Sequence, residues 1–260
     1  MCRFFVAIGA FSPGEILEAL GALREAARHD PYGEALYGES SHGDGWGLFL
    51  AALDGSRSLH YRSLRPIYEE DPWGMLAQAL PGAPVILMAH ARAASEGTPK
   101  DLASTHPVHA RSRWGDLYLV HNGSFAEGPL EAVVGRWPGP HNDTALAAAA
   151  LASRIGRRIS RQDLEWLLGA EASGANLGIA LLGEGIQVVV GSHYRLLGDG
   201  RDEHRSRYYR VYRCEYPGGQ IYASSTIAEL HLRRPCVPMG NGEFHVYEGS
   251  GLVDKWVIGP

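Results

Sequence analysis

Short strand-like runs alternate with tight glycine turns in the last third of the sequence, and this pattern constrains the fold more than any other feature. Gly183-Glu184-Gly185 and Pro217-Gly218-Gly219 are two of these turns. Turns this short join neighbouring antiparallel strands, because parallel strands need a longer crossover. The strands predicted after Gly174 are Asn176–Leu182, Gly185–Val190, Tyr208–Cys214, Gln220–Ala223, Glu243–Tyr247 and Leu252–Ile258.

The earlier part of the chain mixes buried strands with a few helices. Apolar runs at 2–9, 46–52, 84–89 and 116–120 predict strands. Ser12, Pro13 and Glu15 form a capping box that begins a helix. The further expectations are a mobile loop over Tyr32–Gly45, a short helix from Asp71-Pro72 to Pro81-Gly82, an alanine-rich helix capped by Asn142 or Asp143 that ends near Gly156, and a helix capped by Ser160 and Asp163.

Neither repeats nor long linkers divide the chain, so we expect one domain over residues 1–260. Few helices and many short-turned strands favour an α+β fold, with antiparallel sheets sandwiched by helices. A hydrophobic content of 45% and a formal charge of −5 are ordinary for a globular protein and offer no long basic face to nucleic acid. The arginine-rich stretch Arg201–Arg213 is interrupted by acids and is interpreted as a solvated loop and strand.

Compartment and redox state are indicated by the apolar runs and the cysteines. No apolar run approaches the ~20 residues that span a bilayer, so we expect no membrane segment. Cys2, Cys214 and Cys236 are odd in number and lack a CxxC pair, which argues against a disulfide framework and a zinc knuckle. These features favour a reducing cytoplasm and predict no metal and no cofactor.

Cys2 is the first candidate for chemistry. Removal of Met1 would leave this cysteine with a free α-amine, whose pKa near ~7.7–8.0 lets it accept the thiol proton at neutral pH. Nucleophile and base would then belong to one residue. Taken alone, Cys2 is better explained as an ordinary second residue.

Three further groups of polar residues follow predicted strands or begin a helix. Arg92 is suited to a carboxylate because its planar guanidinium makes two parallel bonds, whereas His90 is interpreted as a packed histidine that braces the loop. Asn122 and Gly123 would supply two donors to an oxyanion hole, or would form an ordinary hairpin turn. Asp143 is equally explained as a helix cap.

Taken together and in order, these clusters resemble the glutaminase domain of class II glutamine amidotransferases, which are N-terminal nucleophile hydrolases, and in particular the stand-alone type with a DGWG motif. Each motif is weak alone, but the ordered set is specific. The resembling features are Met1-Cys2-Arg3, Asp44-Gly45-Trp46-Gly47, His90-Ala91-Arg92-Ala93-Ala94-Ser95, Thr105-His106-Pro107, His121-Asn122-Gly123 and Asn142-Asp143-Thr144.

The resemblance implies a four-layer αββα sandwich and a division of roles. Cys2 would attack the γ-carbonyl of glutamine or of a γ-glutamyl amide, and water would hydrolyse the glutamyl thioester. Asn122 and Gly123 would hold the oxyanion, while Arg92, Ser95 and Asp143 would bind the substrate. Ammonia, if released, would pass to solvent or to a separate synthase as partner.

The chain departs from the family at a few positions near these motifs. Many members carry Trp where Ala93 stands, His where Glu96 stands, and a carboxylate where Ala145 stands. These changes bear on the shape of the substrate pocket more than on the cysteine chemistry.

Two alternatives stay open from the sequence. The first is a non-catalytic module of the same fold that binds a separate synthase or an amino-acid-like ligand. The second is a metal-dependent hydrolase that uses His106 and His109, although no HExxH motif or carboxylate-rich partner accompanies that pair.

Overall fold

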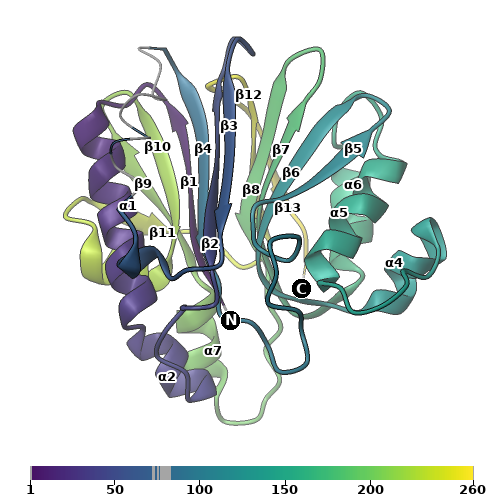
Figure 1. Cartoon of the computed structure of the whole chain (residues 1–260), viewed down its shortest axis with the longest axis horizontal. Helices are drawn as coiled ribbons and strands as arrows, with labels where there is room; N and C mark the ends of the chain where they lie inside the picture. The colour runs from purple at the N-terminus through teal and green to yellow at the C-terminus, as the bar shows by residue number, and fades with distance from the viewer. Residues whose placement is uncertain (1, 72–73, 75, 77–82, 260) are drawn as a thin grey trace.

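Two facing β-sheets with helices on both outer sides make up the fold, which is the αββα arrangement implied by the family resemblance (Figure 1). The computed structural model describes residues 2–71, 74, 76 and 83–259. Helices α1 (Pro13–Arg28) and α2 (Pro31–Tyr37) lie on one outer side. Helices α4 (Glu127–Val134), α5 (Asp143–Arg154) and α6 (Arg161–Leu168) lie on the other. The expectation of an α+β sandwich is confirmed.

Every strand pairing within the two sheets is antiparallel, as the short turns predict. In the described part of the chain the first sheet has seven strands in the order β11-β9-β10-β1-β4-β2-β3, and the second has six in the order β13-β12-β8-β7-β6-β5. The first sheet contains β1 (Arg3–Gly9), β2 (Trp46–Ala52), β3 (Ser58–Ser63), β4 (Val85–Ala91), β9 (Val211–Tyr216), β10 (Gly219–Ser224) and β11 (Cys236–Pro238). The second contains β5 (Val108–Ser112), β6 (Gly115–Phe125), β7 (Glu171–Leu182), β8 (Ile186–Ser192), β12 (Glu243–Glu248) and β13 (Gly251–Val257).

Strand β1 occupies the middle of the first sheet and is buried along its whole length. Phe5 and Ala7 pack in the apolar layer shared with α1, whereas Phe4 and Val6 pack between the two sheets. Side chains alternate between the faces of a strand, so a strand covered on both faces needs a continuous apolar run. This explains why the opening of the sequence lacks a polar face.

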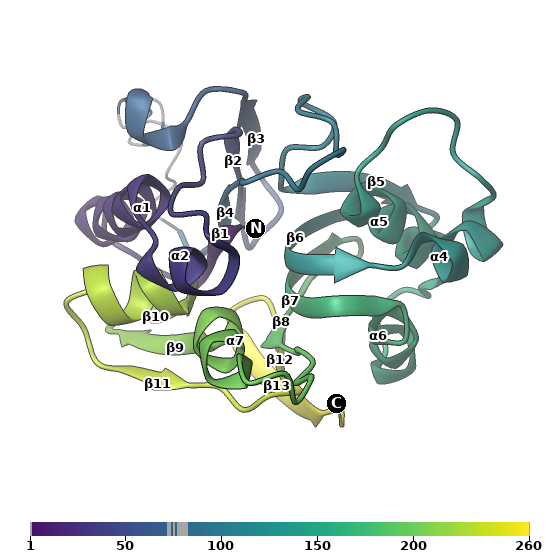
Figure 2. The ribbon, with the colours of Figure 1, turned by 90° about the horizontal axis from the view of Figure 1, so that it is seen from below.

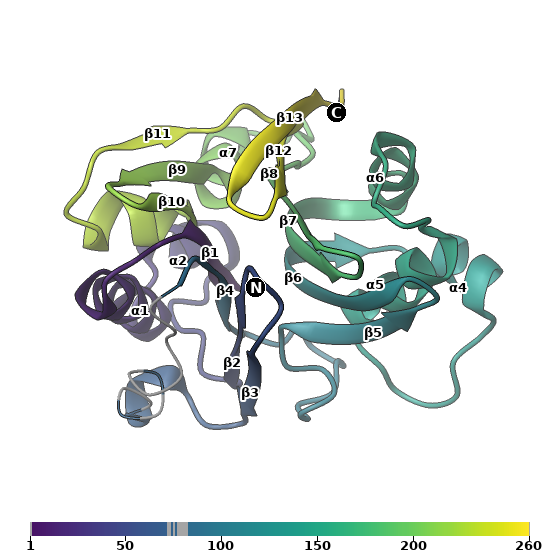
Figure 3. The same ribbon diagram turned by 90° about the horizontal axis from the view of Figure 1, so that it is seen from above.

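The two sheets approach each other closely at Gly178 of β7. A Cβ atom at this position would lie 2.5 Å from a methyl group of Val6 and 2.9 Å from one of Val120. These separations leave no room for a larger side chain. Figure 3 shows the sheets from above, with the C-terminal hairpin β12–β13 at one edge of the second sheet.

The predicted helix caps are confirmed. Ser12 and Glu15 form a reciprocal capping box at α1, and Ser160 and Asp163 form another at α6. At α5 the cap is Asn142, whose side chain accepts from the backbone of the first turn. Asp143 is therefore not needed as the cap of this helix.

Several boundaries differ from the sequence expectations. The stretch expected to be a loop from Tyr32 contains α2, because Asp30 caps this helix, Pro31 begins it and Gly38 ends it in the left-handed conformation. The strand predicted from Tyr208 begins only at Val211. The expected short helix from Asp71-Pro72 to Pro81-Gly82 lies almost wholly outside the described residues.

The arginine-rich stretch was wrongly assigned to a solvated loop and strand. Residues Asp202–Tyr209 form a helix, α7. Its Arg205 is only 7% exposed and is bonded to Asp199 and Asp202. Neutralisation of the cation by these two acids accounts for its burial.

The prediction against a disulfide was also wrong. Cys214 on β9 stands directly opposite Cys236 on β11, and the two are joined by a disulfide bond with their Cα atoms 4.1 Å apart. Strand register brings the two cysteines together, which the count of cysteines could not reveal. The argument from unpaired cysteines for a reducing cytoplasm therefore no longer holds, and the cytoplasmic location stays a prediction. Among the described helices none is long and apolar enough to cross a membrane.

Candidate functional site

The candidate site lies at one end of the sandwich, where strand β1 of the first sheet begins on the side facing the second sheet (Figure 2). Cys2 directly precedes β1 and is 9% exposed. Its backbone N–H donates to Oδ1 of Asn122 over 3.1 Å, and its Sγ lies 3.8 Å from the carbonyl oxygen of Ala93. The first sheet therefore supplies the thiol and the second sheet supplies the amide beside it.

A pocket of about 40 Å³ opens beside the thiol. Residues predicted from the sequence come together here, and Asn122 joins them through its bond to Cys2. The pocket is lined by Cys2, Arg92, Ala93, Ala94, Ser95, Thr98, His106, His121, Gly123, Asn142, Asp143 and Thr144.

Asn122 and Gly123 lie within strand β6 and not in a hairpin turn. This rules out the ordinary-turn interpretation of the pair. Gly123 has a φ of +146°, and a Cβ there would lie 1.7 Å from the carbonyl oxygen of Gly174, so only glycine fits. The Nδ2 atom of Asn122 is buried and has no hydrogen-bond partner among the described residues. A buried donor without a partner is uncommon and is suited to a ligand oxygen.

A second unpaired donor belongs to Arg92, which is 2% exposed. Within the described part of the chain its buried Nη1 has no hydrogen-bond partner, and its Nη2 lies 3.5 Å from Oγ1 of Thr98. Burying a guanidinium without a matching acceptor is costly. An anionic ligand group in the pocket would satisfy this donor.

The DGWG motif shapes the loop that carries Arg92. The Asp44 N–H donates to the Arg92 carbonyl, and the Arg92 N–H donates to the carbonyl of Gly45. The Asp44 carboxylate accepts from the Ala94 N–H at 2.9 Å and from Lys100 at 2.6 Å. Asp44 and Gly45 together therefore fix the backbone on both sides of Arg92, a role that the motif alone did not reveal.

Asp143 and Ser95 complete the polar lining of the pocket. The Asp143 carboxylate accepts from the backbone N–H groups of Phe125 at 2.7 Å and Thr144 at 2.8 Å. These bonds, with a longer one from Thr144 Oγ1 to Oδ1, hold the carboxylate at the N-terminus of α5, and Oδ2 keeps a lone pair for a cationic group. Ser95 is exposed, and its carbonyl accepts from Thr98.

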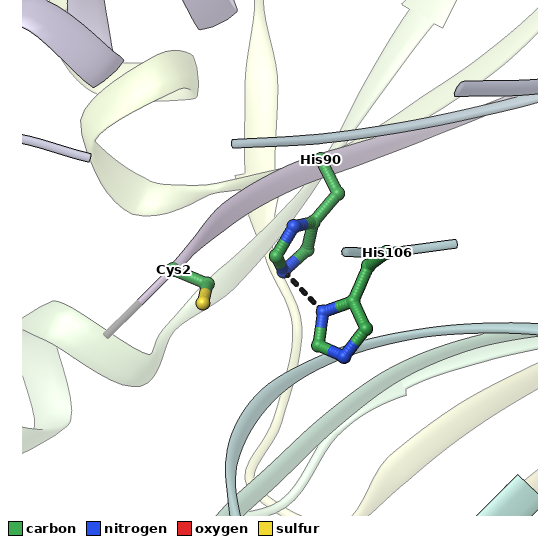
Figure 4. Close-up of side chains that lie close together, drawn as sticks. All are labelled: Cys2, His90 and His106. Atoms are coloured by element: carbon green, nitrogen blue, oxygen red, sulfur yellow. Dashed lines mark hydrogen bonds between the residues drawn. The ribbon is translucent and has the colours of Figure 1, made fainter. Parts of the chain in front are cut away.

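Two buried histidines lie beside Cys2 (Figure 4). His90 Nε2 lies 3.1 Å from the His121 carbonyl oxygen, which can only accept, so this nitrogen carries a proton. His106 Nδ1 lies 2.8 Å from the same nitrogen and therefore accepts. Burial, reinforced by neighbouring cationic groups, holds the pKa of both imidazoles well below its ordinary value, so both are neutral. The packed role expected for His90 is confirmed.

Potential metal ligands do gather at this point. One donor atom from each of Cys2, His90 and His106 lies within 4.8 Å of the other two. The mutual hydrogen bond of the two imidazoles nevertheless accounts for their approach without an ion. His109, the other residue of the metal hypothesis, lies on β5 and bonds to Asp116 at 2.9 Å, so the pair does not share a site.

A buried ion pair anchors the chain next to Cys2, and the sequence did not point to it. Arg3 donates to the Asp30 carboxylate through Nε at 2.6 Å and Nη2 at 3.0 Å, and neither residue is exposed. Asp30 also contacts His42 Nε2 at 2.9 Å and accepts from Thr226 Oγ1 at 2.6 Å. Burial alone would raise the pKa of the Asp30 carboxyl, but Arg3 and His42 bring it far below the ordinary value.

Tyr208 is a further residue of the site that the sequence missed. Its hydroxyl lies 3.4 Å from Oδ1 of Asn122 and 3.4 Å from the Cys2 carbonyl oxygen. The side chain is fully buried, and the Arg3 guanidinium lies over its ring, 3.9 Å from the centroid. The acidic pair Asp202 and Glu203 in the first turn of α7 was the available signal that a helix, not a strand, leads to Tyr208.

Solved structures share this architecture, although no protein-family model and no curated protein matches the sequence. A glutamine phosphoribosylpyrophosphate amidotransferase from B. subtilis aligns with a TM-score of 0.62 and 17% identity, over 99% of this chain and 49% of that one. A glutamine aminotransferase class-II domain protein from Silicibacter pomeroyi aligns with a TM-score of 0.55 and 10% identity, over the whole of both chains.

These neighbours define the class of fold to which the chain is similar. They are class II glutamine amidotransferase domains, so the fold predicted from the ordered motifs is shown. The chain spans about half the length of the B. subtilis enzyme. Identities this low carry the fold alone.

Proposed function

We propose that this chain hydrolyses the γ-amide of glutamine or of a γ-glutamyl amide, with Cys2 as the nucleophile. The observation that supports it most is the bond from the Cys2 backbone N–H to Oδ1 of Asn122, whose Nδ2 is buried and has no hydrogen-bond partner in the described part of the chain. The fold shared with class II glutamine amidotransferase domains supports the same reaction class.

The chemistry begins with removal of Met1. The freed α-amine of Cys2 takes the thiol proton, and the thiolate attacks the γ-carbonyl carbon of the substrate. Negative charge develops on the carbonyl oxygen and is stabilised by Asn122 Nδ2 and the Gly123 N–H. The α-ammonium of Cys2 then protonates the leaving nitrogen, which departs as ammonia or an amine. Water attacks the thioester, releases glutamate and restores the thiol.

Substrate recognition falls to the other residues of the pocket. Arg92 binds the α-carboxylate through its unpaired guanidinium nitrogen, and Asp143 binds the α-ammonium. Ser95 contributes polar atoms to the lining of the pocket. This assignment matches one fixed cation and one fixed anion to the two charges of an amino acid.

A larger cavity next to the pocket is the reason to propose γ-glutamyl amides as substrates in addition to glutamine. It measures about 920 Å³ and has Thr98 in common with the pocket at Cys2. The smaller pocket alone accommodates only a small group, whereas the adjoining space would receive a substituent. Glutamine itself would release ammonia, for which a separate synthase is the proposed acceptor.

The test is glutamate release by the protein and by its Cys2→Ala variant, from glutamine and from γ-glutamyl amides of larger amines. We expect the variant to lose essentially all activity. A glutamine-like electrophile should add once to the active protein, with the adduct on Cys2. Equal glutamate release by both proteins would rule the proposal out.

The competing function is a non-catalytic module that binds a synthase or an amino-acid-like ligand. The departures at Ala93, Glu96 and Ala145 motivate it. Intact mass separates the two cases. Retained Met1 with glutamine binding but no turnover would favour the module, whereas a mature chain that begins at Cys2 and turns over glutamine excludes it.

A further inference from the structure

The Asn122 side chain can act as an oxyanion donor only in one of its two amide orientations. In the observed orientation, Oδ1 faces the Cys2 N–H at 3.1 Å and the Tyr208 hydroxyl at 3.4 Å. Nδ2 is left buried without a partner among the described residues. Rotating the amide by half a turn would place the Nδ2 hydrogens against the Cys2 N–H and the Tyr208 hydroxyl and withdraw them from a ligand. The hydroxyl disfavours this orientation when its proton points to Oδ1 instead of to the Cys2 carbonyl oxygen, which is also 3.4 Å away.

Of the two groups that hold Oδ1, only Tyr208 keeps a constant role during the proposed reaction. The nitrogen of Cys2 must gain and lose a proton when it serves as the base, so its bond to Oδ1 changes in strength. In the proposed reaction no proton passes through the Tyr208 hydroxyl. Full burial raises the pKa of this phenol well above its ordinary value, so it stays protonated.

The position of Tyr208 is itself fixed from several sides. The guanidinium of Arg3 lies over its ring, and Arg3 Nη1 donates to its carbonyl oxygen at 2.9 Å. Ser225 Oγ donates to the same carbonyl at 3.1 Å. A ring held in this way keeps its hydroxyl beside the Asn122 amide.

We propose that Tyr208 is a positioning residue that fixes the Asn122 amide with its N–H groups toward the substrate oxygen. This inference rests on the proposed function, because it concerns the oxyanion donor of that reaction. Tyr208 is not among the residues that line the pocket at Cys2 and acts through Asn122.

The test is a double-mutant cycle of Tyr208→Phe with Asn122→Ala. Alone, Y208F should lower kcat about two- to tenfold, the value of one lost hydrogen bond, and leave KM nearly unchanged. N122A should lower kcat about a hundredfold or more. If Tyr208 acts through Asn122, adding Y208F to N122A should cause no further loss.

Tyr209→Phe is the matched control. Tyr209 is the next residue of α7 and is also buried, but its hydroxyl contacts Tyr37 and Ser173 instead of Asn122. Y209F should therefore retain the kcat of the unaltered protein. Urea unfolding of all variants would show whether a loss of kcat reflects a loss of folded protein.

A readout without turnover keeps this inference separate from the proposed function. The side-chain amide resonances of Asn122, identified by their absence in N122A, should shift or broaden in Y208F and stay in place in Y209F. Unchanged resonances in Y208F, or an equal fall of kcat in both backgrounds of the cycle, would overturn the role of Tyr208. If the unaltered protein releases no glutamate, only the proposed function is refuted, and the resonances of Asn122 still test the role of Tyr208.

Discussion

Replacing Asp30 by Asn should destabilise the protein far more than the change of one atom suggests. The carboxylate is fully buried and is contacted by Arg3, His42 and Thr226 at 2.6–3.0 Å. The substitution leaves the guanidinium of Arg3 buried without a counter-charge. Removing one partner of a buried ion pair costs about 3–5 kcal/mol, a large part of the ~5–15 kcal/mol that keeps a domain folded.

Urea unfolding gives the measurement, with Asp116→Asn as control. Asp116 pairs with Arg111 on the surface, where the two side chains are 35% and 68% exposed. Such a pair contributes about 0–1 kcal/mol. We expect a large fall of the urea midpoint in D30N and almost none in D116N. A D30N protein within about 1 kcal/mol of the parent would refute the assigned importance of this pair.

The pH dependence of stability supplies an independent check on Asp30. Its folded-state pKa lies far below its ordinary value because Arg3 and His42 outweigh burial. The stabilisation is therefore complete above the unfolded-state pKa of about 4 and is lost as the pH falls below it. D30N should lose less stability than the parent between about pH 5 and 3. Parallel acid curves for the two proteins would contradict the ion pair.

Three further predictions concern the disulfide, one histidine and one glycine. The Cys214–Cys236 bond spans 22 residues, so its reduction or the double replacement by Ser should cost about 3 kcal/mol; an unchanged urea midpoint in reductant would contradict this. Burial lowers the pKa of the His193 imidazole, but the hydrogen bond and charge of Glu171 outweigh burial. The pKa is therefore raised above its ordinary value. The stability from this pair is present below about pH 6.5 and is lost as the pH rises through the folded-state pKa. His193→Gln should flatten that loss, and identical stability curves would be evidence against the pair. Gly123→Ala should destabilise β6 by at least ~1–3 kcal/mol and abolish glutamate release, because its Cβ would collide with a carbonyl oxygen of β7; an equal melting temperature would be inconsistent with this geometry.

The sequence predicted the layers and much of the pocket because the informative signals are local. A cap such as Ser12 with Glu15 lies within one helical turn, and a buried strand such as β1 is recognised by its own apolar run. Arg92 follows strand β4, and Gly123 lies near the end of strand β6. That these segments meet was implied only by the resemblance of their order to the motifs of class II glutamine amidotransferases.

The remaining features depend on contacts between distant parts of the chain. Tyr208 reaches Asn122 across 86 positions, and its neighbourhood has the β-branched and aromatic composition of a strand. Cys214 meets Cys236 only through the register of two strands. Spacing along a sequence carries no information on register, so neither contact was predictable.

The disulfide has a consequence for colloidal behaviour as well as for folding. Strand β11 has three residues and forms the outer edge of the first sheet, beside β9. The disulfide keeps strand β11 paired with β9, so that the backbone N–H and C=O groups on this edge of β9 are not open to pairing with another molecule. In a reducing solution at high protein concentration, detachment of β11 would expose a template for self-association, so light scattering should rise before the core melts.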